Sequence, residues 1–357
     1  MGIIRPAGAL EVPDRADREP APLWTRHGCG RLRRGSALLA VLWLSAALAA
    51  IAFSLASTVR GEAERTSTAV DGTRAYYLAS GAIYRTTLRL LWNWSNPNLP
   101  PPLRPLNRAM DMLPFPTGMV RVEIIPESSK LDINTAPPDR LFRLLVNLGT
   151  EPGRAHEIAA AILDWRSPSP GGALSAFDLF YLSRNPSFRP RHASFEEIEE
   201  LLVVRGMTPD IFYGTWLRAG GGEDNAPLVR QGGLADCVSV FGTADRFDAN
   251  TAQPALLNSV GVPPDVVAAL VARRRFAPFL NDGDLSRFLQ GVGDALAHLR
   301  VGGNSIFTLR ATARPRLANG QLSDLRRTVA ALVKFMPPGY DSPYHILRWY
   351  DSAWEQQ

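Results

Sequence analysis

The spacing of hydrophobic residues changes several times along this chain, and each change marks a different predicted element. An apolar run extends from Ser36 to Val59 and carries no charged residue until Arg60. At about 1.5 Å per residue, a helix of this length spans a bilayer core of roughly 30 Å. From Arg60 to about Trp92 there is no proline, and apolar residues recur at spacings typical of an amphipathic helix. We therefore expect a transmembrane and stem helix over residues 36–96.

Alternating segments predict an antiparallel sheet whose strands come from two distant parts of the chain. Residues 119–125 alternate as a half-buried strand, and further strand candidates lie at 305–314, 327–335 and 344–350. Turns containing Gly, Asn and Pro separate the three C-terminal candidates. We expect one face of these strands to cover a helix, so their other face must be polar or form an interface.

An internal repeat lies between the predicted strands. The segment 131–141 (LDINTAPPDRL) recurs 116 residues later at 247–257 (FDANTAQPALL), with several identical residues at matching places. The threonines are candidate N-caps of helices that open with proline, and the asparagines can bridge each strand end to the helix start. These predicted structural residues are Asn134, Thr135, Asn250 and Thr251.

Both copies of the repeat continue into helices joined by tight turns, an arrangement that resembles helix-hairpin-helix or SAM-like units. DNA binding is therefore a rival function. Such units bind phosphate through free backbone N–H groups of a glycine-rich hairpin. The hairpin at 149–153 (GTEPG) carries an acidic residue, and the hairpin at 261–264 (GVPP) carries two prolines. We therefore expect no nucleic acid partner.

The charge distribution also argues against a nucleic-acid partner. The sequence pI is about 9.5 and the net charge is +5, but residues 1–35 hold seven arginines against four acidic residues, which leaves about +2 on the rest. That remainder has no dense basic run to attract phosphates. The composition, 46% hydrophobic and 20% charged, is that of a folded protein.

Sequence patterns of catalysis are absent, so we expect no enzyme. His156 and Glu157 open a His-Glu-x-x-His pattern, but residue 160 is alanine and the second metal ligand is missing. The chain has no Gly-x-Ser-x-Gly, P-loop or dinucleotide fingerprint. Cys237 lies in a strand-like alternation that predicts a buried, inert thiol.

The order of basic residues, glycine and apolar run predicts processing and topology. Basic residues at 26, 31, 33 and 34 precede the run and mixed charges follow it, so the N-terminus is expected in the cytoplasm. Gly35 stands before the apolar run, so cleavage between Gly35 and Ser36 would leave the helix on the mature protein. This order is typical of a type IV prepilin-like leader. An uncleaved signal anchor is the alternative.

Taken together, these features resemble the type II secretion minor pseudopilin K (GspK) family. The resemblance rests on the leader, on Ala40 where other pseudopilins have glutamate, on the Asn-Thr-Ala-Pro unit, on the turn VRGMTP at 204–209 and on the C-terminal strands. It covers the chain from about Arg33 to the end. It implies an α+β fold with a pilin-like antiparallel sheet and a large inserted α-helical domain.

This fold divides the chain into seven predicted segments. They are a prepilin-type leader (1–35), the transmembrane and stem helix (36–96), the start of the pilin-like sheet (97–130), the inserted helical domain (131–216), strands (217–250), a second helical repeat (251–300) and C-terminal sheet strands (301–357).

The resemblance implies a membrane-anchored assembly protein at the tip of the type II secretion pseudopilus. Its expected partners are I- and J-type minor pseudopilins, the major pseudopilin, the prepilin peptidase and inner-membrane lipid. It would nucleate the pseudopilus and support export across the outer membrane, with a single span, a cytoplasmic N-terminus and a periplasmic bulk. A single-pass membrane DNA receptor and a generic signal-anchored periplasmic scaffold are the alternatives.

Calcium is the one cofactor that the resemblance suggests. Relatives often carry an acidic loop, associated with calcium, after an Asp-Trp pair at the end of a helix. Here the stretch 164–178 keeps only Asp164 and Asp178, which are the predicted metal ligands. Calcium normally takes roughly six to eight oxygen ligands, so no cofactor is firmly predicted. The sequence NDGD at 281–284 is expected to cap a helix beginning near Leu285.

Overall fold

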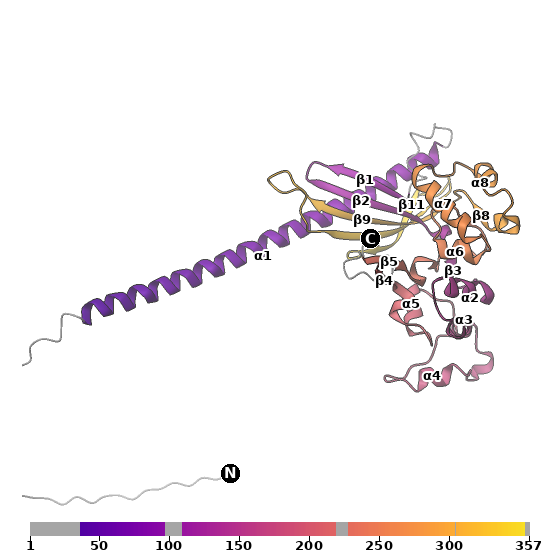
Figure 1. Ribbon diagram of the computed structural model, residues 1–357, viewed down its shortest axis with the longest axis horizontal. Coiled ribbons are helices and arrows are strands. Elements are labelled where there is room, and N and C mark those ends of the chain that lie inside the picture. The colour runs from indigo at the N-terminus through magenta and orange to yellow at the C-terminus, as the bar shows by residue number, and fades with distance from the viewer. Residues whose placement is uncertain (1–35, 97–108, 219–227, 304, 354–357) are drawn as a thin grey trace, which may run out of the picture. The chain divides into compact units, whose positions relative to one another are not determined.

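The computed structural model describes residues 36–96, 109–218, 228–303 and 305–353, and the chain divides into two units, residues 1–66 and 67–357 (Figure 1). Helix α1 (Ser36–Ser95) contributes its first part to one unit and its second part to the other. Among the described residues, α1 is the one helix long and apolar enough to cross a membrane, and its apolar window is fully exposed.

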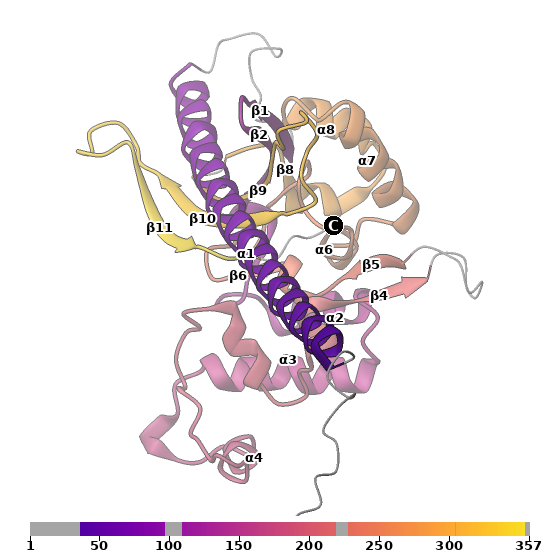
Figure 2. The same cartoon turned by 90° about the vertical axis from the view of Figure 1, so that its left-hand side faces the viewer.

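The unit of residues 67–357 contains a five-stranded antiparallel sheet that packs on the second part of α1 (Figures 1 and 2). The strand order is β1-β2-β9-β10-β11. The strands are β1 (Met110–Phe115), β2 (Gly118–Pro126), β9 (Ile306–Pro315), β10 (Arg327–Phe335) and β11 (Tyr344–Tyr350). The predicted α+β class and the four predicted strands are confirmed; β1, which contains Pro114, was not predicted from the sequence.

Alternation along the strands explains how the sheet packs. In β2, Val120, Val122 and Ile124 are buried against α1, whereas Glu123 between them faces the opposite side. On that side Glu123 lies opposite Arg310 of β9, and the two side chains form a 2.9 Å ion pair. The opposite face therefore carries an ion pair between β2 and β9, whereas on β10 it buries Ala330 and Leu332.

Small residues on α1 allow the sheet to approach closely. Ala75, Ala79 and Ala82 are fully buried, and Ile83 fills the space beside them. Burying one such large aliphatic side chain stabilises a fold by about 1.5–3 kcal/mol. The contact between α1 and the sheet therefore supplies one of the two hydrophobic cores of this unit.

The helical body is inserted between β2 and β9. Its α-helices are α2 (Pro138–Asn147), α3 (Pro152–Arg166), α4 (Asp178–Leu182), α5 (Pro209–Tyr213), α6 (Pro254–Ser259), α7 (Pro264–Phe276) and α8 (Asp282–Phe288). Its 3-10 segments are η3 (Glu127–Ser129), η4 (Pro170–Gly172), η5 (Ile198–Val203), η6 (Leu234–Asp236) and η7 (Gly293–His298). Asn281 caps α8 by accepting a hydrogen bond from the Asp284 N–H, and the helix begins at Asp282, earlier than the predicted start near Leu285.

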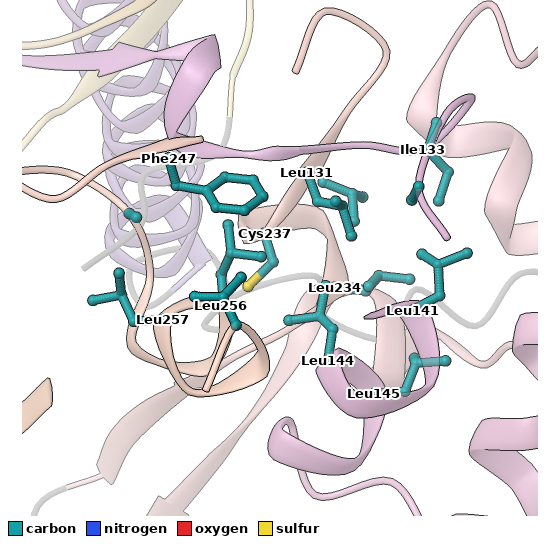
Figure 3. Packing of buried hydrophobic residues seen from close by; sticks show 14 of the residues in the cluster. Leu131, Ile133, Leu141, Leu144, Leu145, Leu234, Cys237, Phe247, Leu256 and Leu257 are labelled. Atoms are coloured by element: carbon teal, nitrogen blue, oxygen red, sulfur yellow. The ribbon is translucent and has the colours of Figure 1, made fainter. Parts of the chain in front are cut away.

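One continuous core joins both copies of the repeat. Helices α2 and α6 pack against each other, and Leu131 of the first copy lies with Phe247 and Leu256 of the second around the buried Cys237 (Figure 3). This core runs from Leu131 to Leu299. The predicted division into segments 131–216 and 251–300 therefore separates residues that share one hydrophobic interior.

The strands between the two copies do not join the main sheet, in contrast to β9–β11. Strands β4 (Gly214–Arg218) and β5 (Leu228–Gly232) form a separate antiparallel hairpin. Two short parallel pairs complete the body. They are β3 (Leu131–Asp132) with β6 (Val238–Ser239), and β7 (Phe247–Asp248) with β8 (Leu299–Arg300).

Candidate functional site

The repeat motif forms the same hydrogen-bonded turn in both copies. In the first, the Asp132 carboxylate accepts hydrogen bonds from the Asn134 N–H at 2.9 Å and the Thr135 hydroxyl at 2.8 Å. In the second, Asp248 accepts from the N–H of residue 250 at 3.1 Å and from the Thr251 hydroxyl at 3.0 Å. The aspartate, which the sequence analysis did not single out, therefore organises each turn.

The predicted N-cap roles of Thr135 and Thr251 are wrong. The residues at the N-cap positions are Pro137 and Gln253, because each helix begins later than expected, at Pro138 and Pro254. The threonine hydroxyls are instead held by the preceding aspartates.

The asparagines bridge to a distant segment rather than to the helix start. Asn134 donates to the carbonyl of Phe195 at 3.0 Å and accepts from its N–H at 2.7 Å. Asn250 makes the same pair of bonds to Phe279, at 2.9 and 2.8 Å. Both asparagines thus satisfy backbone groups that would otherwise be buried without partners, and their role is structural.

An arginine completes each motif. Arg166 at the end of α3 donates to the carbonyls of Ile133 and Ala136 at 2.5 Å, and Arg274 on α7 donates to those of Ala249 and Ala252 at 3.0 and 2.7 Å. Burial lowers the pKa of Arg274 to about 10. Arg274 nevertheless remains charged near neutral pH, and its hydrogen bonds to the two carbonyls stabilise the turn.

In the first hairpin, an acidic side chain occupies two backbone donors that a phosphate would use. The Glu151 carboxylate accepts hydrogen bonds from the N–H groups of Gly153 and Arg154, at 2.8 and 2.9 Å, where α3 begins. These two bonds lower the pKa of Glu151. An internal carboxylate therefore occupies the position where a helix-hairpin-helix unit would bind phosphate.

The structure brings both predicted metal ligands together with a histidine that the sequence analysis missed. Asp164 at the end of α3, Asp178 at the start of α4 and His192 place one ligand atom each within 4.8 Å of one another. Ser175 links the two carboxylates. Its hydroxyl donates to Asp164 Oδ2 at 3.1 Å, and its N–H donates to Asp178 Oδ2 at 2.7 Å.

His192 donates hydrogen bonds from both sides of its ring. Nδ1 lies 3.2 Å from the carbonyl oxygens of Asp164 and Ser167, and Nε2 lies 2.9 Å from Asp178 Oδ1. Carbonyl oxygens only accept hydrogen bonds, so Nδ1 carries a proton. The pKa of Asp178 is lowered: burial raises it, but the hydrogen bonds from Ser175 and His192 outweigh that effect. Asp178 is thus ionised, and Nε2 must carry a proton as well.

These donors do not fit calcium. Both carboxylate oxygens of Asp178 and the carbonyl oxygens of Asp164 and Ser167 already accept hydrogen bonds within the cluster. Calcium requires roughly six to eight oxygen ligands, and a ring nitrogen that carries a proton has no lone pair for a metal.

Comparison of the two repeat copies provides the signal that could have revealed His192. Phe195 follows Arg166 by 29 residues, whereas Phe279 follows the equivalent Arg274 by five. The first copy therefore carries an extra segment of residues 167–194, and the cluster is built around it.

The remaining predicted site lies at the beginning of α1. Gly35 lies outside the described residues, and Ser36 is the first residue of α1. Ala40 is exposed on the same helix.

Comparisons with known proteins agree with this architecture. The family model "Type II secretion system (T2SS), protein K" matches residues 125–213. The protein K of Pectobacterium carotovorum subsp. carotovorum is 29% identical over 202 residues, which cover 50% of this chain and 60% of that protein. The protein K of Klebsiella pneumoniae is 34% identical over 80 residues, 21% of this chain and 24% of that protein. The matched region thus spans less than two thirds of either relative.

The fold is also that of a solved structure. The crystal structure of the GspK-GspI-GspJ complex from the type 2 secretion system of enterotoxigenic Escherichia coli contains a chain that superposes with a TM-score of 0.54. The match has 17% sequence identity and covers 82% of this chain and all of that one. In one domain, in part of its sequence and in its fold, this chain is thus similar to type II secretion system protein K.

Proposed function

We propose that this chain is a minor pseudopilin of a type II secretion system, and that it assembles with other minor pseudopilins through its stem. One observation carries the proposal, an exposed apolar face on the part of α1 that packs on the sheet. We call this face the stem stripe. It is formed by Val70, Tyr77, Tyr84, Leu88 and Trp92.

The stem stripe lies opposite the face of α1 that is already covered. At about 100° per residue, its five side chains fall within roughly 40° of one line along the helix. They are between 44% and 69% exposed, whereas Ala79 and Ile83 on the covered face are fully buried. A row of exposed apolar side chains along one face of a helix indicates an interaction surface, although Arg74 interrupts the row and Tyr84 also stacks on Trp349.

A second helix of the same kind fits the stem stripe. Helices pack by interlocking rows of side chains at three- and four-residue spacings, and the stripe presents its side chains at spacings of four and seven. In the solved complex GspK is bound to GspI and GspJ. The stems of I- and J-type minor pseudopilins are therefore the proposed partners, and the major pseudopilin would follow below them.

The anchor part of α1 supports an inner-membrane location. Basic residues precede it in the sequence, which favours a cytoplasmic N-terminus and a periplasmic bulk. Prepilin peptidase would cleave between Gly35 and Ser36 and leave the apolar segment in the lipid.

Ala40 favours the tip position. An acidic residue at this point of a pseudopilin would pair with the N-terminal amine of a neighbour within the bilayer, where an unpaired charge costs several kcal/mol. A subunit with alanine there needs no neighbour above it. It can therefore begin the pseudopilus and support protein export from its tip.

Co-purification tests this function. Full-length chain in detergent is expected to retain I- and J-type minor pseudopilins, and Leu88→Asp is expected to reduce the retained amount at least about tenfold, because burying an unpaired carboxylate costs well over the ~1.4 kcal/mol that a factor of ten requires. Leu280→Asp is the matched control, since Leu280 is 56% exposed and Leu88 is 58% exposed. Equal retention of partners by both variants would contradict a role for the stem stripe.

A further inference from the structure

The contacts that hold the extra segment of residues 167–194 to the helical body include those of Tyr181 and those of an aspartate-histidine cluster. Tyr181 is fully buried, and its ring packs edge-on against Trp165 at 5.4 Å between ring centroids. Its hydroxyl accepts a hydrogen bond from the Arg205 N–H at 3.2 Å. The cluster is formed by Asp164, Asp178 and His192.

His192 is held where it can join the two ends of this segment. Its backbone has a φ of 48°, in the left-handed region that few residues other than glycine adopt. From there the ring reaches the last turn of α3 through the carbonyls of Asp164 and Ser167, and reaches the first turn of α4 through Asp178.

The charge balance of the cluster requires a cation. Asp178 is 2% exposed and Asp164 is partly buried. Two carboxylates this close together repel each other in a low dielectric unless a positive charge lies between them. In many proteins a divalent ion supplies that charge, and here a ring nitrogen of His192 lies within 4.8 Å of a carboxylate oxygen of each aspartate.

We propose that His192 takes the place of a bound metal ion, so that the hydrogen bonds of its ring fasten the segment 167–194 to α3 and no calcium is needed. The ring satisfies Asp178 Oδ1 and two backbone carbonyls at once.

Limited trypsin digestion of the full-length chain in detergent tests the proposal. Arg184 is exposed within the segment, so the rate of cleavage after it reports local opening. The rate is followed by mass spectrometry and compared with cleavage after the exposed Arg316. His192→Asn keeps a residue that tolerates the left-handed backbone and removes the ring.

We expect His192→Asn to raise cleavage after Arg184 about tenfold, since hydrogen bonds to a charged group contribute at least ~1.4 kcal/mol, a factor of ten. Cleavage after Arg316 should not change. His156→Gln is the control, because His156 is an exposed histidine on the same helix α3. An unchanged rate after Arg184 in His192→Asn would overturn the proposal.

The second arm adds Ca²⁺, Zn²⁺ or a chelator to the unmodified chain. We expect the same cleavage rate after Arg184 and the same Tm in all conditions. Protection by Ca²⁺ would show that oxygen ligands are free for that ion, and protection by Zn²⁺ would show that a His192 nitrogen has a lone pair. Either result would overturn the proposal.

Discussion

At the residue scale, the two copies of the repeat make the same contacts with partners that differ in sequence position. Asn134 and Asn250 are identical in the aligned segments, so the sequence reveals that they matter. Their partners, Phe195 and Phe279, bind through backbone groups. Because a backbone partner leaves no side-chain signal, the bridge could not be predicted from the sequence.

Replacing Asn250 should destabilise the helical body. Asn250→Ala removes two hydrogen bonds to the backbone of Phe279 in a buried place, where the loss of a hydrogen-bond partner costs about 1–3 kcal/mol. We expect a loss of about 2–5 kcal/mol in the free energy of unfolding, measured by urea denaturation. Asn147→Ala is the control because Asn147 is exposed at the end of α2. A loss below about 1 kcal/mol would contradict the bridging role.

The hydrogen bonds of Glu151 lead to a prediction about DNA binding. Its carboxylate holds the hairpin N–H groups, so neither the full-length chain nor Glu151→Gln should bind duplex DNA at physiological salt. The glutamine keeps a hydrogen-bond acceptor while it removes the charge. A change in fluorescence anisotropy of labelled DNA that disappears steeply with added salt would contradict this prediction.

At the element scale, hydrophobic periodicity predicted most strands of the main sheet. It failed for an edge strand and for a residue whose partners are distant in the sequence. The bounds of β10 and β11 are those predicted, although β11 alternates in burial whereas β10 is buried over six consecutive residues. Strand β1 was missed because an edge strand tolerates Pro114 and buries little. His192 was missed because its partners, Asp164 and Asp178, precede it by 28 and 14 residues.

Two substitutions on opposite faces of helix α1 test which face is covered within the chain. Ile83→Ala removes a fully buried side chain from the contact with the sheet and should cost about 2–5 kcal/mol of unfolding free energy. Leu88→Ala lies on the stem stripe and should change it by less than about 0.5 kcal/mol. Equal losses in urea denaturation would mean that the stem stripe is covered within the chain.

At the scale of the whole molecule, the described residues follow the order of long apolar helix, first sheet strands, inserted helical body and last sheet strands, and this fold resembles that of a chain in the solved GspK-GspI-GspJ complex. The match to the K family lies in residues 125–213, and the fold likeness extends over 82% of the chain. The single core that joins both repeat copies explains why the predicted boundary at residue 216 does not separate two bodies. Distant residues such as Leu131 and Phe247 share that core, and sequence periodicity alone does not reveal such pairing.

The most direct test of the pseudopilin account is the N-terminal residue of the chain purified from the inner membrane. Edman sequencing or intact mass is predicted to give Ser36 as the first residue, because Gly35 lies between a basic segment and the apolar start of α1. Replacing Gly35 with leucine should leave the leader in place. An intact Met1, or a cut near Ala56 at the end of the apolar run, would contradict the account.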